Sequence, residues 1–351
     1  MNNKLLVSNK INLKQALRAV NDGGEKSLII VDEKNTLLGT LSDGDLRRAI
    51  LSGTQLNQSV DEIYNSSPTY FYKNKYTKDE AKKTFLKEKF DIIPVVNSNK
   101  KVVKILLLDD IFEKNKSTNS NQLNLPIVIM AGGRGTRLEP FTKVLPKPLI
   151  PLNDKTIIEH IINKFTVIGV KDVFITVNYK SRILKAFFEE LNPNYKVSFI
   201  EEHKPLGTAG SLQYLKGKIN CPFFISNCDI IIDIDYKDLY SFHQMGGYDL
   251  TLVASAKEYI IPYGTCQLNS EGSLSNINEK PEYNFLVNTG LYIMDPKILK
   301  TIPENKFYHI TDLIGDIIGK SKKVGVYPVS DDAWIDIGQW DEYKKIYNQI
   351  T

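Results

Sequence analysis

The sequence predicts an α/β protein in two parts: a mostly parallel sheet covered by helices on both faces, preceded by a smaller module with an internal repeat. Three observations support this prediction. After residue 125, apolar strands alternate with helical segments. Before residue 115, one order of elements occurs twice. Between these parts, "EKNKSTNSNQLN" (113–124) is polar and has little to bury, which predicts a linker.

The repeat has the order helix, strand, turn, strand, helix. Its first copy reads "NLKQALRAVNDGG", "SLIIVDE", "LLGTLSD" and "GDLRRAILSG", and its second reads "TKDEAKKTFLKEKF", "DIIPVVNS", "KVVKILLL" and "DDIFEK". A sheet this small cannot bury both of its faces alone, so we expect the two copies to pack together. The predicted domains are therefore 1–57 and 58–115 for the copies, a linker over 116–124, and a larger domain over 125–351.

Composition excludes several classes of protein. The 351 residues are 42% hydrophobic and 25% charged with a net charge of +4, as expected for a globular protein with a substantial core. No apolar run approaches the roughly 20 residues that span a bilayer, and the N-terminus lacks the apolar segment of a signal peptide, so we expect a cytoplasmic protein with no membrane partner. No dense basic run with interleaved aromatics is present, which argues against nucleic acid. The three cysteines are not spaced like zinc ligands and are expected to be buried, reduced thiols.

The order of elements in residues 1–115 and the segment "GTLSDGDLRRAI" resemble a tandem pair of CBS domains, also called a Bateman module. In that family a Ser or Thr holds phosphate and an Asp three residues later holds ribose, and Ser42 and Asp45 match this pattern. The resemblance implies a regulatory adenine or guanine nucleotide between the copies. The second copy keeps Asp110 but has Leu107 in place of the hydroxyl. The alternative is a module for interaction or assembly only, and we expect a homo-oligomer.

A glycine-rich, basic loop follows the first strand of the larger domain, in "MAGGRGTRLEPFTKVLPKPLIPL" (130–152). It matches neither the Rossmann fingerprint nor the P-loop. Its glycines nevertheless let the backbone approach an anion closely, and four cations lie in the same segment. These residues are Gly132, Gly133, Gly135, Arg134, Arg137, Lys143 and Lys147. Three prolines stiffen the backbone around Lys147.

The segments G-x-G-T-R-L, P-x-T and P-K-P, all in register here, resemble the signature of the sugar-1-phosphate nucleotidyltransferases. That resemblance covers residues 125–351 and implies a Rossmann-like domain of the GT-A type. It assigns catalysis to Arg137 and Lys147, and nucleotide binding to Gly132, Gly133, Gly135 and Thr136. "ISNCDI" and "WIDIGQWDEY" resemble the segments that hold Mg²⁺, which makes Asp229 and Asp336 the expected ligands.

Four further segments resemble the parts of that family that contact the base and the sugar phosphate. "EEHKPLGTAGSL" (201–212) is similar to the loop beside the base, with Gly207 and Thr208 at its turn. "YGT" contributes Gly264, "NEKPE" contributes Glu279 and Lys280, and "VNTGLYIM" contributes Asn288 and Thr289. The resemblance assigns sugar hydroxyls to Glu279 and the sugar phosphate to Lys280.

The implied reaction joins an NTP to a sugar 1-phosphate and releases pyrophosphate. "LGTAG" resembles guanylyltransferases of the mannose and heptose kinds, which favours GTP. Two CBS domains followed by such a transferase domain resemble the domain order of the glucosamine-1-phosphate guanylyltransferases of legionaminic acid synthesis. Two alternatives stay open: uridylyl, cytidylyl or thymidylyl transfer to another hexose 1-phosphate, and a catalytically inactive protein that senses nucleotides.

Overall fold

The structure is a computed structural model that describes residues 3–88, 90–111, 122–338, 340 and 342–344. The chain forms two compact units, which are described separately below. The first comprises Met1–Thr118, Ser255–Val287 and Pro328–Asp332, and the second comprises Asn119–Ala254, Asn288–Tyr327 and Ala333–Thr351. Most of the predicted linker lies outside the described residues. Its last part, 122–124, contains neither helix nor strand, and the Leu123 amide donates to the Ile168 carbonyl at 2.8 Å.

The first unit contains the predicted repeat as two three-stranded sheets of the same topology. Their elements are η1 Asn3–Leu5, β1 Leu6–Ser8, α1 Leu13–Gly23, β2 Ser27–Val31, β3 Leu37–Ser42, α2 Asp43–Leu51, β4 Phe71–Tyr72, α3 Lys78–Glu88, β5 Ile92–Val96, β6 Val102–Leu107 and α4 Leu108–Ile111. In each copy the first two strands are parallel and the last two antiparallel. Both antiparallel pairs shift register before their last residue pair, at Ile30/Val31 and Val95/Val96. The internal repeat is therefore confirmed, and the two copies also share the position of this register shift.

The two copies are joined through their β-turns and through apolar packing. The Leu37 amide donates to the Lys100 carbonyl at 2.9 Å, and the Val102 amide donates to the Asn35 carbonyl at 3.0 Å. Ile92 and Val96 of the second copy pack in the same hydrophobic cluster as Leu28 and Leu41 of the first. Burial of apolar surface across the pair thus stabilises sheets that would be too small alone.

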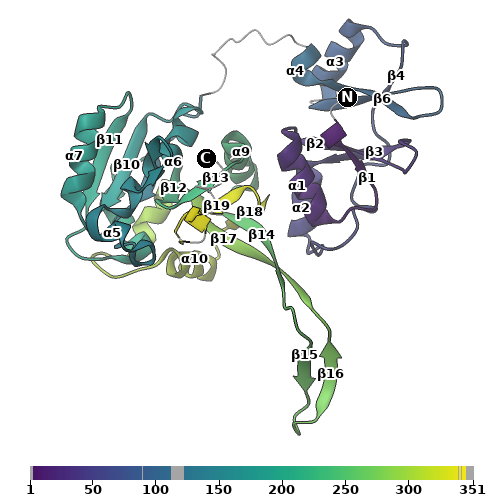
Figure 1. The fold of residues 1–351 in the computed structure, drawn as a ribbon. Helices are drawn as coiled ribbons and strands as arrows, with labels where there is room; N and C mark the ends of the chain where they lie inside the picture. The colour runs from purple at the N-terminus through teal and green to yellow at the C-terminus, as the bar shows by residue number, and fades with distance from the viewer. Residues whose placement is uncertain (1–2, 89, 112–121, 339, 341, 345–351) are drawn as a thin grey trace. The chain divides into compact units, whose positions relative to one another are not determined.

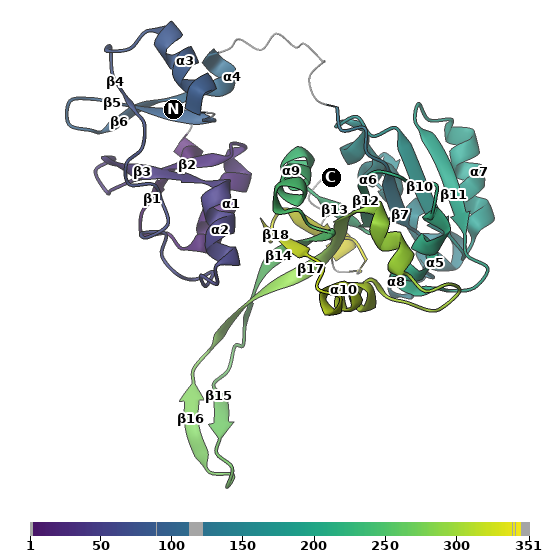
Figure 2. The ribbon, with the colours of Figure 1, turned by 180° about the vertical axis from the view of Figure 1, so that it is seen from behind.

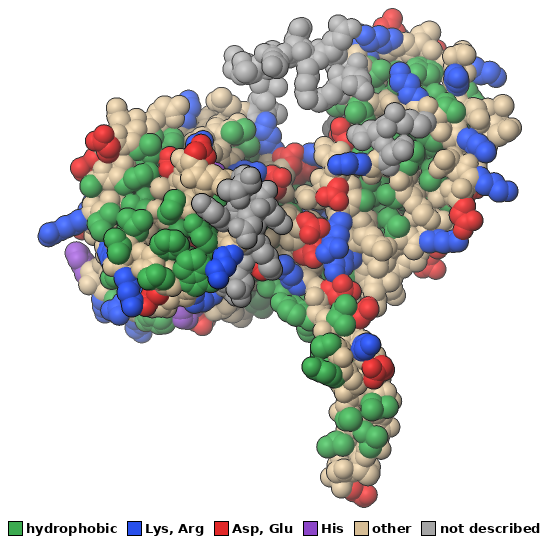
Figure 3. Space-filling view, in the orientation of Figure 1, with side chains coloured by type: hydrophobic (Ala, Val, Ile, Leu, Met, Phe, Trp, Pro, Cys, Tyr) green, Lys and Arg blue, Asp and Glu red, His purple; other side chains and the backbone are tan. Residues whose placement is uncertain are grey.

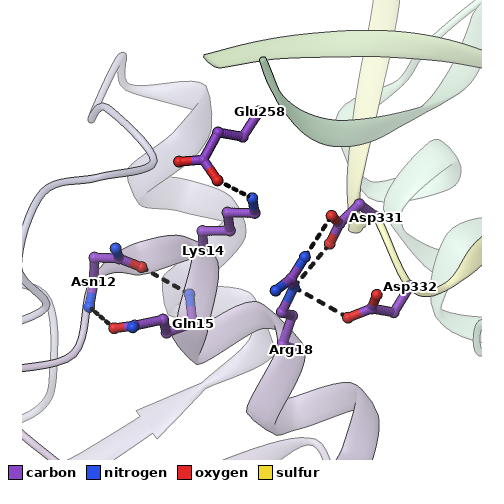
Figure 4. A network of polar contacts seen from close by, with 7 residues as sticks. All are labelled: Asn12, Lys14, Gln15, Arg18, Glu258, Asp331 and Asp332. Atoms are coloured by element: carbon purple, nitrogen blue, oxygen red, sulfur yellow. Dashed lines mark hydrogen bonds and ion pairs between the residues drawn. The ribbon is translucent and has the colours of Figure 1, made fainter. Parts of the chain in front are cut away.

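Helix α1 also contacts the two later segments that belong to the first unit. Lys14 forms an ion pair with Glu258 at 2.5 Å, and Arg18 donates two hydrogen bonds to Asp331 at 2.6 and 3.0 Å (Figure 4). Burial alone would raise the pKa of Asp331, but the bonds and charge of Arg18 outweigh it and hold that pKa below its usual value. These contacts connect the N-terminal module with the segments at Ser255–Val287 and Pro328–Asp332.

The segment Ser255–Val287 also contains an antiparallel hairpin, β15 (Thr265–Leu268) and β16 (Leu274–Asn278). Large apolar side chains lie exposed along it (Figure 3), among them Leu268, Leu274 and Ile277, each more than half exposed. Cys266 lies on the same hairpin and is exposed, and Cys221 is only partly buried. The expectation of buried thiols was therefore wrong for both and holds for Cys228 alone.

The second unit is built on a seven-stranded sheet with the order β11-β10-β7-β12-β17-β14-β18. Its elements are β7 Ile127–Met130, η2 Thr136–Leu138, α5 Phe141–Val144, η3 Lys147–Leu149, β8 Pro151–Leu152, β9 Lys155–Thr156, α6 Ile157–Thr166, β10 Asp172–Val177, α7 Ser181–Leu191, β11 Lys196–Glu201, α8 Gly207–Gly210, η4 Ser211–Leu215, β12 Phe223–Asn227, β13 Ile230–Ile232, α9 Tyr236–Gly246, β14 Leu250–Ile260, β17 Glu282–Met294, η5 Pro296–Thr301, α10 Ile310–Gly319, β18 Val324–Ser330 and β19 Trp334–Asp336. The pairs β11–β10, β10–β7 and β7–β12 are parallel, and β17 runs antiparallel to β12. The predicted mostly parallel sheet is confirmed. The helix expected over 210–217 is instead the single turn α8 followed by the 3-10 helix η4.

Helices cover both faces of this sheet, as the alternation of strands and helices predicts. On one face, the Phe165 ring of α6 lies 5.2 Å from the Phe224 ring of β12, and Phe188 of α7 lies 6.0 Å from Phe199 of β11. On the other face, Val128 and Ile225 pack in one cluster with residues of η4, η5 and α10. Helix α7 lies beside β11 in both views (Figure 1, Figure 2). Among the residues that the structure describes, none of the helices has the length and apolar character needed to cross a bilayer.

Candidate active site

The strand order of the second unit places its loops around one point. The chain goes from β7 to β10 and β11 on one side of β7, then returns to place β12 on the other side. The carboxyl ends of β7 and β12 therefore flank a topological switch point, where open α/β sheets bind ligands. A pocket of about 420 Å³ opens there. It is lined by Met130, Gly132, Gly133, Gly135, Thr136, Arg137, Lys147, Thr176, Glu202, Pro205, Leu206, Gly207, Thr208, Asn227, Cys228, Asp229, Phe307 and His309.

Gly135 shapes the glycine-rich loop, because its φ of 68° lies in the left-handed region that favours glycine. A Cβ at this position would lie 2.9 Å from Thr142 Cγ2 and 3.0 Å from Lys147 Cβ. Its carbonyl accepts from the Thr142 hydroxyl and from the Leu138 amide, both at 3.0 Å. The loop can thus pack directly on the segment that carries Lys147, and the exposed Arg137 lies on the same loop.

Asp229 and Asp336, more than a hundred residues apart in sequence, are brought together by the short antiparallel pair β13–β19. Ile230 lies opposite Asp336 in this pair, and the Ile337 amide donates to the Asp229 carbonyl at 2.8 Å. The Asp336 side chain accepts from the Gly338 amide at 2.9 Å. Because backbone bonds fix both strands, the two aspartates are held side by side.

Lys147 completes this group through an ion pair with Asp229. Gly338 shows how closely the three side chains converge. A Cβ on Gly338 would clash with the Asp229 carboxylate and lie 2.8 Å from Asp336 Oδ1 and 3.1 Å from Lys147 Nζ. Two predicted metal ligands and a predicted catalytic cation therefore border one small space that only glycine leaves open.

The donor set at this space fits a hard divalent cation. Two carboxylates supply oxygen ligands of the kind that Mg²⁺ prefers, and this cation commonly takes its other ligands from water and substrate phosphates. No group of three or more His, Cys, Asp or Glu in the described part of the chain could enclose a metal. Burial, and secondarily the charge of Asp229, raises the pKa of the Cys228 thiol to about 12. Cys228 therefore stays protonated and is unsuited to ligation.

The segment Leu206–Gly210 is held against residues from a distant loop. Gly207 has a φ of 78°, and a Cβ there would lie 2.7 Å from the Tyr308 carbonyl oxygen. That carbonyl accepts from the amides of Ala209 and Gly210 at 3.0 and 3.1 Å. The Thr208 hydroxyl in turn accepts from the Ile310 amide at 2.9 Å. Gly207 and Thr208 thus line the pocket together with the glycine-rich loop, as expected of a base-binding segment.

Several pocket residues were not singled out from the sequence. Glu202 stands next to another glutamate, and only the fold shows which of the two is buried. Phe307 and His309 come from a loop with no motif, and the backbone bonds of Tyr308 bring them to the pocket. Gly338 belongs to the segment "WIDIGQWDEY" quoted above, two residues after Asp336, so a glycine at that place was a usable signal for close packing.

The residues expected to bind the sugar do not line this pocket. Thr289 is 2% exposed, and its hydroxyl donates to the Val253 carbonyl at 2.8 Å, so it supports the sheet. Asn288 is exposed and donates to the Tyr292 hydroxyl at 2.8 Å. Glu279 and Lys280 are exposed residues of the first unit, whereas every pocket-lining residue belongs to the second.

Gly264 lies close to Glu279 within the first unit. A Cβ on Gly264 would be 2.9 Å from Glu279 Oε2. Lys280, the next residue, has a φ of 46°, a left-handed conformation that is uncommon for lysine. The sequence segments "YGT" and "NEKPE" are thus adjacent in space, as expected if they serve one substrate.

A second cleft of about 420 Å³ lies between the two repeats. Its lining residues are Ser27, Thr40, Ser42, Asp45, Asn65, Thr69, Phe90, Asp91 and Ile92. Ser42 caps helix α2: its hydroxyl donates to Asp45 Oδ2 at 2.6 Å and accepts from the Asp45 amide at 3.1 Å. Asp45 also forms an ion pair with Arg48. The structure therefore brings the two predicted regulatory residues together in one cleft.

With both sites described, the comparisons identify the family. The profile of the nucleotidyl transferase family matches residues 127–351, and that of the CBS domain matches residues 1–52. The chain belongs to the nucleotidyl transferase family. This agrees with the predicted fold, a Rossmann-like nucleotidyltransferase domain preceded by CBS domain structure.

Curated relatives and a solved structure show which members of this family the chain is similar to. A mannose-1-phosphate guanyltransferase of Schizosaccharomyces pombe is 34% identical over 228 residues, covering 62% of this chain and 61% of that protein. One of Hypocrea jecorina is 37% identical over 185 residues, covering 50% of each. The crystal structure of HddC from Yersinia pseudotuberculosis is 26% identical with a TM-score of 0.51, covering 65% of this chain and 100% of HddC. The chain thus spans between half and two thirds of the length of these curated relatives.

Proposed function

We propose that this protein transfers GMP from GTP to a sugar 1-phosphate, giving a GDP-sugar and pyrophosphate. The observation that carries the proposal is the convergence of Lys147, Asp229 and Asp336 around Gly338, since Lys147 and Asp229 also line the pocket of the glycine-rich loop. A cation, two carboxylates and a loop of backbone amides are what a polyphosphate and its divalent counterion require. The relatives named guanyltransferases support GTP as the donor.

The chemistry needs no general base, because the attacking phosphate oxygen is already ionised at neutral pH. The obstacle is the repulsion between a sugar phosphate and a polyphosphate, so catalysis rests on screening charge and aligning the two groups. In the proposal, Arg137 and the amides of Gly132, Gly133, Gly135 and Thr136 bind the β- and γ-phosphates. Lys147 exchanges part of its interaction with Asp229 for the α-phosphate as charge develops there.

The proposed cofactor is Mg²⁺, held by Asp229 and Asp336. When bound, it would neutralise phosphate charge and hold both substrates in a common geometry. The Gly338 amide orients the Asp336 carboxylate toward this role, and the pairing of strand β13 with β19 holds Asp229 in place. Lys280 is proposed to position the incoming phosphate, while Gly264, Glu279, Asn288 and Thr289 serve the sugar site, Thr289 through the strand that it supports.

A matrix of nucleoside triphosphates against sugar 1-phosphates, with pyrophosphate release as the readout, tests this proposal. GTP, UTP, CTP and dTTP would each be paired with mannose, glucosamine and glucose 1-phosphates, using the full chain and Mg²⁺. We expect turnover with GTP and one preferred sugar phosphate. Turnover only with UTP, CTP or dTTP would establish the first alternative, and no turnover with any pair would support an inactive sensor.

The N-terminal module is proposed to bind a regulatory nucleotide at Ser42 and Asp45 and to contribute to a homo-oligomer. The support is that both residues line one cleft between the repeats. A ligand there changes turnover only if it binds two states of the enzyme with different affinity. Turnover of the full chain would be titrated with AMP, ATP and GMP, using Ser42→Ala and, as a control, Ser98→Ala on an exposed turn. A response that Ser42→Ala leaves unchanged would contradict the site, and no response in any variant would leave assembly as the role of the module.

A further inference from the structure

The segment between β18 and β19 passes from the first compact unit to the second. Its residues Asp331 and Asp332 belong to the first unit, whereas Ala333 and strand β19 belong to the second. Strand β19 ends with Asp336, the proposed ligand of the divalent cation. A group that holds Asp331 and Asp332 therefore acts only a few residues away from this carboxylate.

Arg18 of helix α1 is the group that holds this segment (Figure 4). Its guanidinium donates to both carboxylate oxygens of Asp331, at 3.0 and 2.6 Å, and its Nε lies 3.1 Å from Asp332 Oδ2. The Asp331 side chain is only 15% exposed, so water and salt screen the pair less than they screen exposed charges. A guanidinium that binds a carboxylate through two bonds fixes its orientation as well as its position.

The N-terminal module also holds the strands on either side of this contact. One helical turn earlier on α1, Lys14 pairs with Glu258 of β14 at 2.5 Å. Arg47 of α2 donates to the Pro328 carbonyl of β18. Ala256 of β14 is fully buried in the hydrophobic cluster that contains residues of α1 and α2. Because apolar packing contributes to this attachment, loss of the Arg18 side chain should weaken one contact without separating the elements.

Backbone bonds continue from Asp332 to Asp336. The Asp233 amide donates to the Ala333 carbonyl at 2.8 Å, and β19 then pairs with β13 as far as Asp336. A sheet of two such short strands is marginally stable alone, so its position depends on what holds its ends. At one end, the Ile337 amide donates to the Asp229 carbonyl at 2.8 Å. At the other end, the chain continues directly from the two aspartates that Arg18 holds.

We propose that Arg18 is a positioning residue for Asp336. By holding Asp331 and Asp332, it keeps β19, and with it the Asp336 carboxylate, in the geometry that binds the divalent cation. The inference rests on the proposed function, because it takes Asp336 as a ligand of that cation. Arg18 does not line the nucleotide pocket. Through this residue the N-terminal module contributes to turnover without supplying a catalytic group.

The first test compares the Mg²⁺ requirement of Arg18→Ala and Lys10→Ala in the full chain, with pyrophosphate release as the readout. Lys10 is the matched control, because it pairs at 2.6 Å with Glu33 of the same module and both side chains are exposed. In Arg18→Ala, the Mg²⁺ concentration for half-maximal rate should rise on the order of tenfold, as when a residue that orients a metal ligand is lost. The value of kcat at saturating Mg²⁺ should stay close to wild type, and Lys10→Ala should change neither quantity.

Two further variants show whether the effect passes through Asp331. Asp331→Asn should raise the Mg²⁺ requirement as Arg18→Ala does, and the double variant should add little, since both changes remove the same interaction. Arg18→Lys keeps the charge but not the planar pair of donors, so its Mg²⁺ requirement should lie between those of wild type and Arg18→Ala. Fully additive effects of the two single changes would contradict the proposed route through Asp331.

A second readout needs neither Mg²⁺ nor substrate. Hydrogen exchange of the backbone amides in 333–338, followed by mass spectrometry, reports how often the β13–β19 pairing opens. Exchange in this segment should be faster in Arg18→Ala than in the wild-type protein, and Lys10→Ala should leave it unchanged. An unchanged exchange rate in Arg18→Ala would overturn the inference.

The outcomes separate this inference from the proposed function. Absence of turnover by the wild-type protein with every substrate pair would remove the proposed function, and faster exchange over 333–338 in Arg18→Ala would even then support the positioning of β19. Normal turnover with an unchanged Mg²⁺ requirement in Arg18→Ala would overturn the inference and leave the function standing. An equal loss of kcat at every Mg²⁺ concentration, with a lowered Tm and faster exchange throughout the chain, would show that Arg18 only stabilises the fold, and would also overturn it.

Discussion

The pocket beside the glycine-rich loop and the cleft between the two repeats have the same volume, about 420 Å³. Their charges differ. The pocket combines Arg137, Lys147 and open glycine backbone with Asp229, whereas the lining of the cleft includes Asp45 and Asp91 and, among the described residues, no lysine or arginine. Volume therefore says little about which ligand each site holds. Charge predicts that the pocket takes a polyphosphate with its counterion, and that the cleft takes a ligand with few phosphates.

The largest effect should follow from removing the acids of the pocket. Asp229→Asn and Asp336→Asn should each lower kcat by at least about 1,000-fold, because a divalent cation contributes several kcal/mol of charge stabilisation in such reactions. Asp233→Asn is the control, since Asp233 is exposed and pairs with Lys164. The measurement is the rate of pyrophosphate release by each variant and by the wild-type protein over a titration of Mg²⁺. Near-normal activity of either variant at limiting Mg²⁺ would rule out the ligand pair.

Gly338→Ala tests the space between the same groups without changing any charge. The added methyl group would meet both carboxylates and Lys147, so kcat should fall on the order of 100-fold, as for small misplacements at a reacting centre. Gly315→Ala is the matched control, because nothing lies within 4 Å of a Cβ there. Equal activity of the two variants would show that the convergence around Gly338 is not needed for turnover.

Arg137→Ala and Lys280→Ala should separate the two substrates. Loss of Arg137 should lower kcat on the order of 100-fold, because its charge matters most as pyrophosphate leaves. Loss of Lys280 should raise KM for the sugar phosphate and leave KM for GTP nearly unchanged. Initial rates with each substrate varied in turn give both constants. If both variants changed only KM for GTP, these assignments would fail.

A smaller effect should distinguish ligands in the cleft. AMP should bind the full chain several-fold more tightly than ATP, because no lysine or arginine among the described residues lines the cleft to bind added phosphates, and the charge of Arg48 is already paired with Asp45. Calorimetric titration without Mg²⁺ measures this difference. Tighter binding of ATP would mean that charge does not distinguish the two sites as argued above.

Local patterns made the main features of both sites predictable. The repeat was visible as an order of elements, and the glycine-rich loop carried its cations within a few residues, so neither required long-range information. Asp229 and Asp336 were singled out because each stands in a segment that resembles a motif of the family, and the structure brings the two residues together, while their role as ligands stays a prediction. Phe307 and His309 could not be found this way, since backbone bonds of Tyr308 to Ala209 and Gly210 bring them to the pocket.

The compact units also depend on contacts that no local pattern reveals. The sequence placed everything after residue 125 in one domain, yet Ser255–Val287 and Pro328–Asp332 group with the N-terminal module. Ion pairs such as Lys14–Glu258 and Arg18–Asp331 join residues more than 200 positions apart. In the sequence, each of these residues looks like an ordinary surface charge. The ion pairs could therefore not be predicted from the sequence.

Gly338 has a consequence for genetic variation in this protein. Every missense change at this codon adds at least a Cβ, and that atom would clash with the Asp229 carboxylate. In a saturation mutagenesis screen for activity, position 338 should therefore accept no substitution, as we also expect for Asp229 and Asp336. Gly338 itself has no side-chain functional group, so this intolerance would come from the space alone. Positions such as Gly272, whose φ is 82° with no neighbour near a Cβ, should instead accept asparagine, which visits that conformation readily. The pattern of tolerated alleles would thus distinguish a glycine kept for space from a glycine kept for backbone conformation.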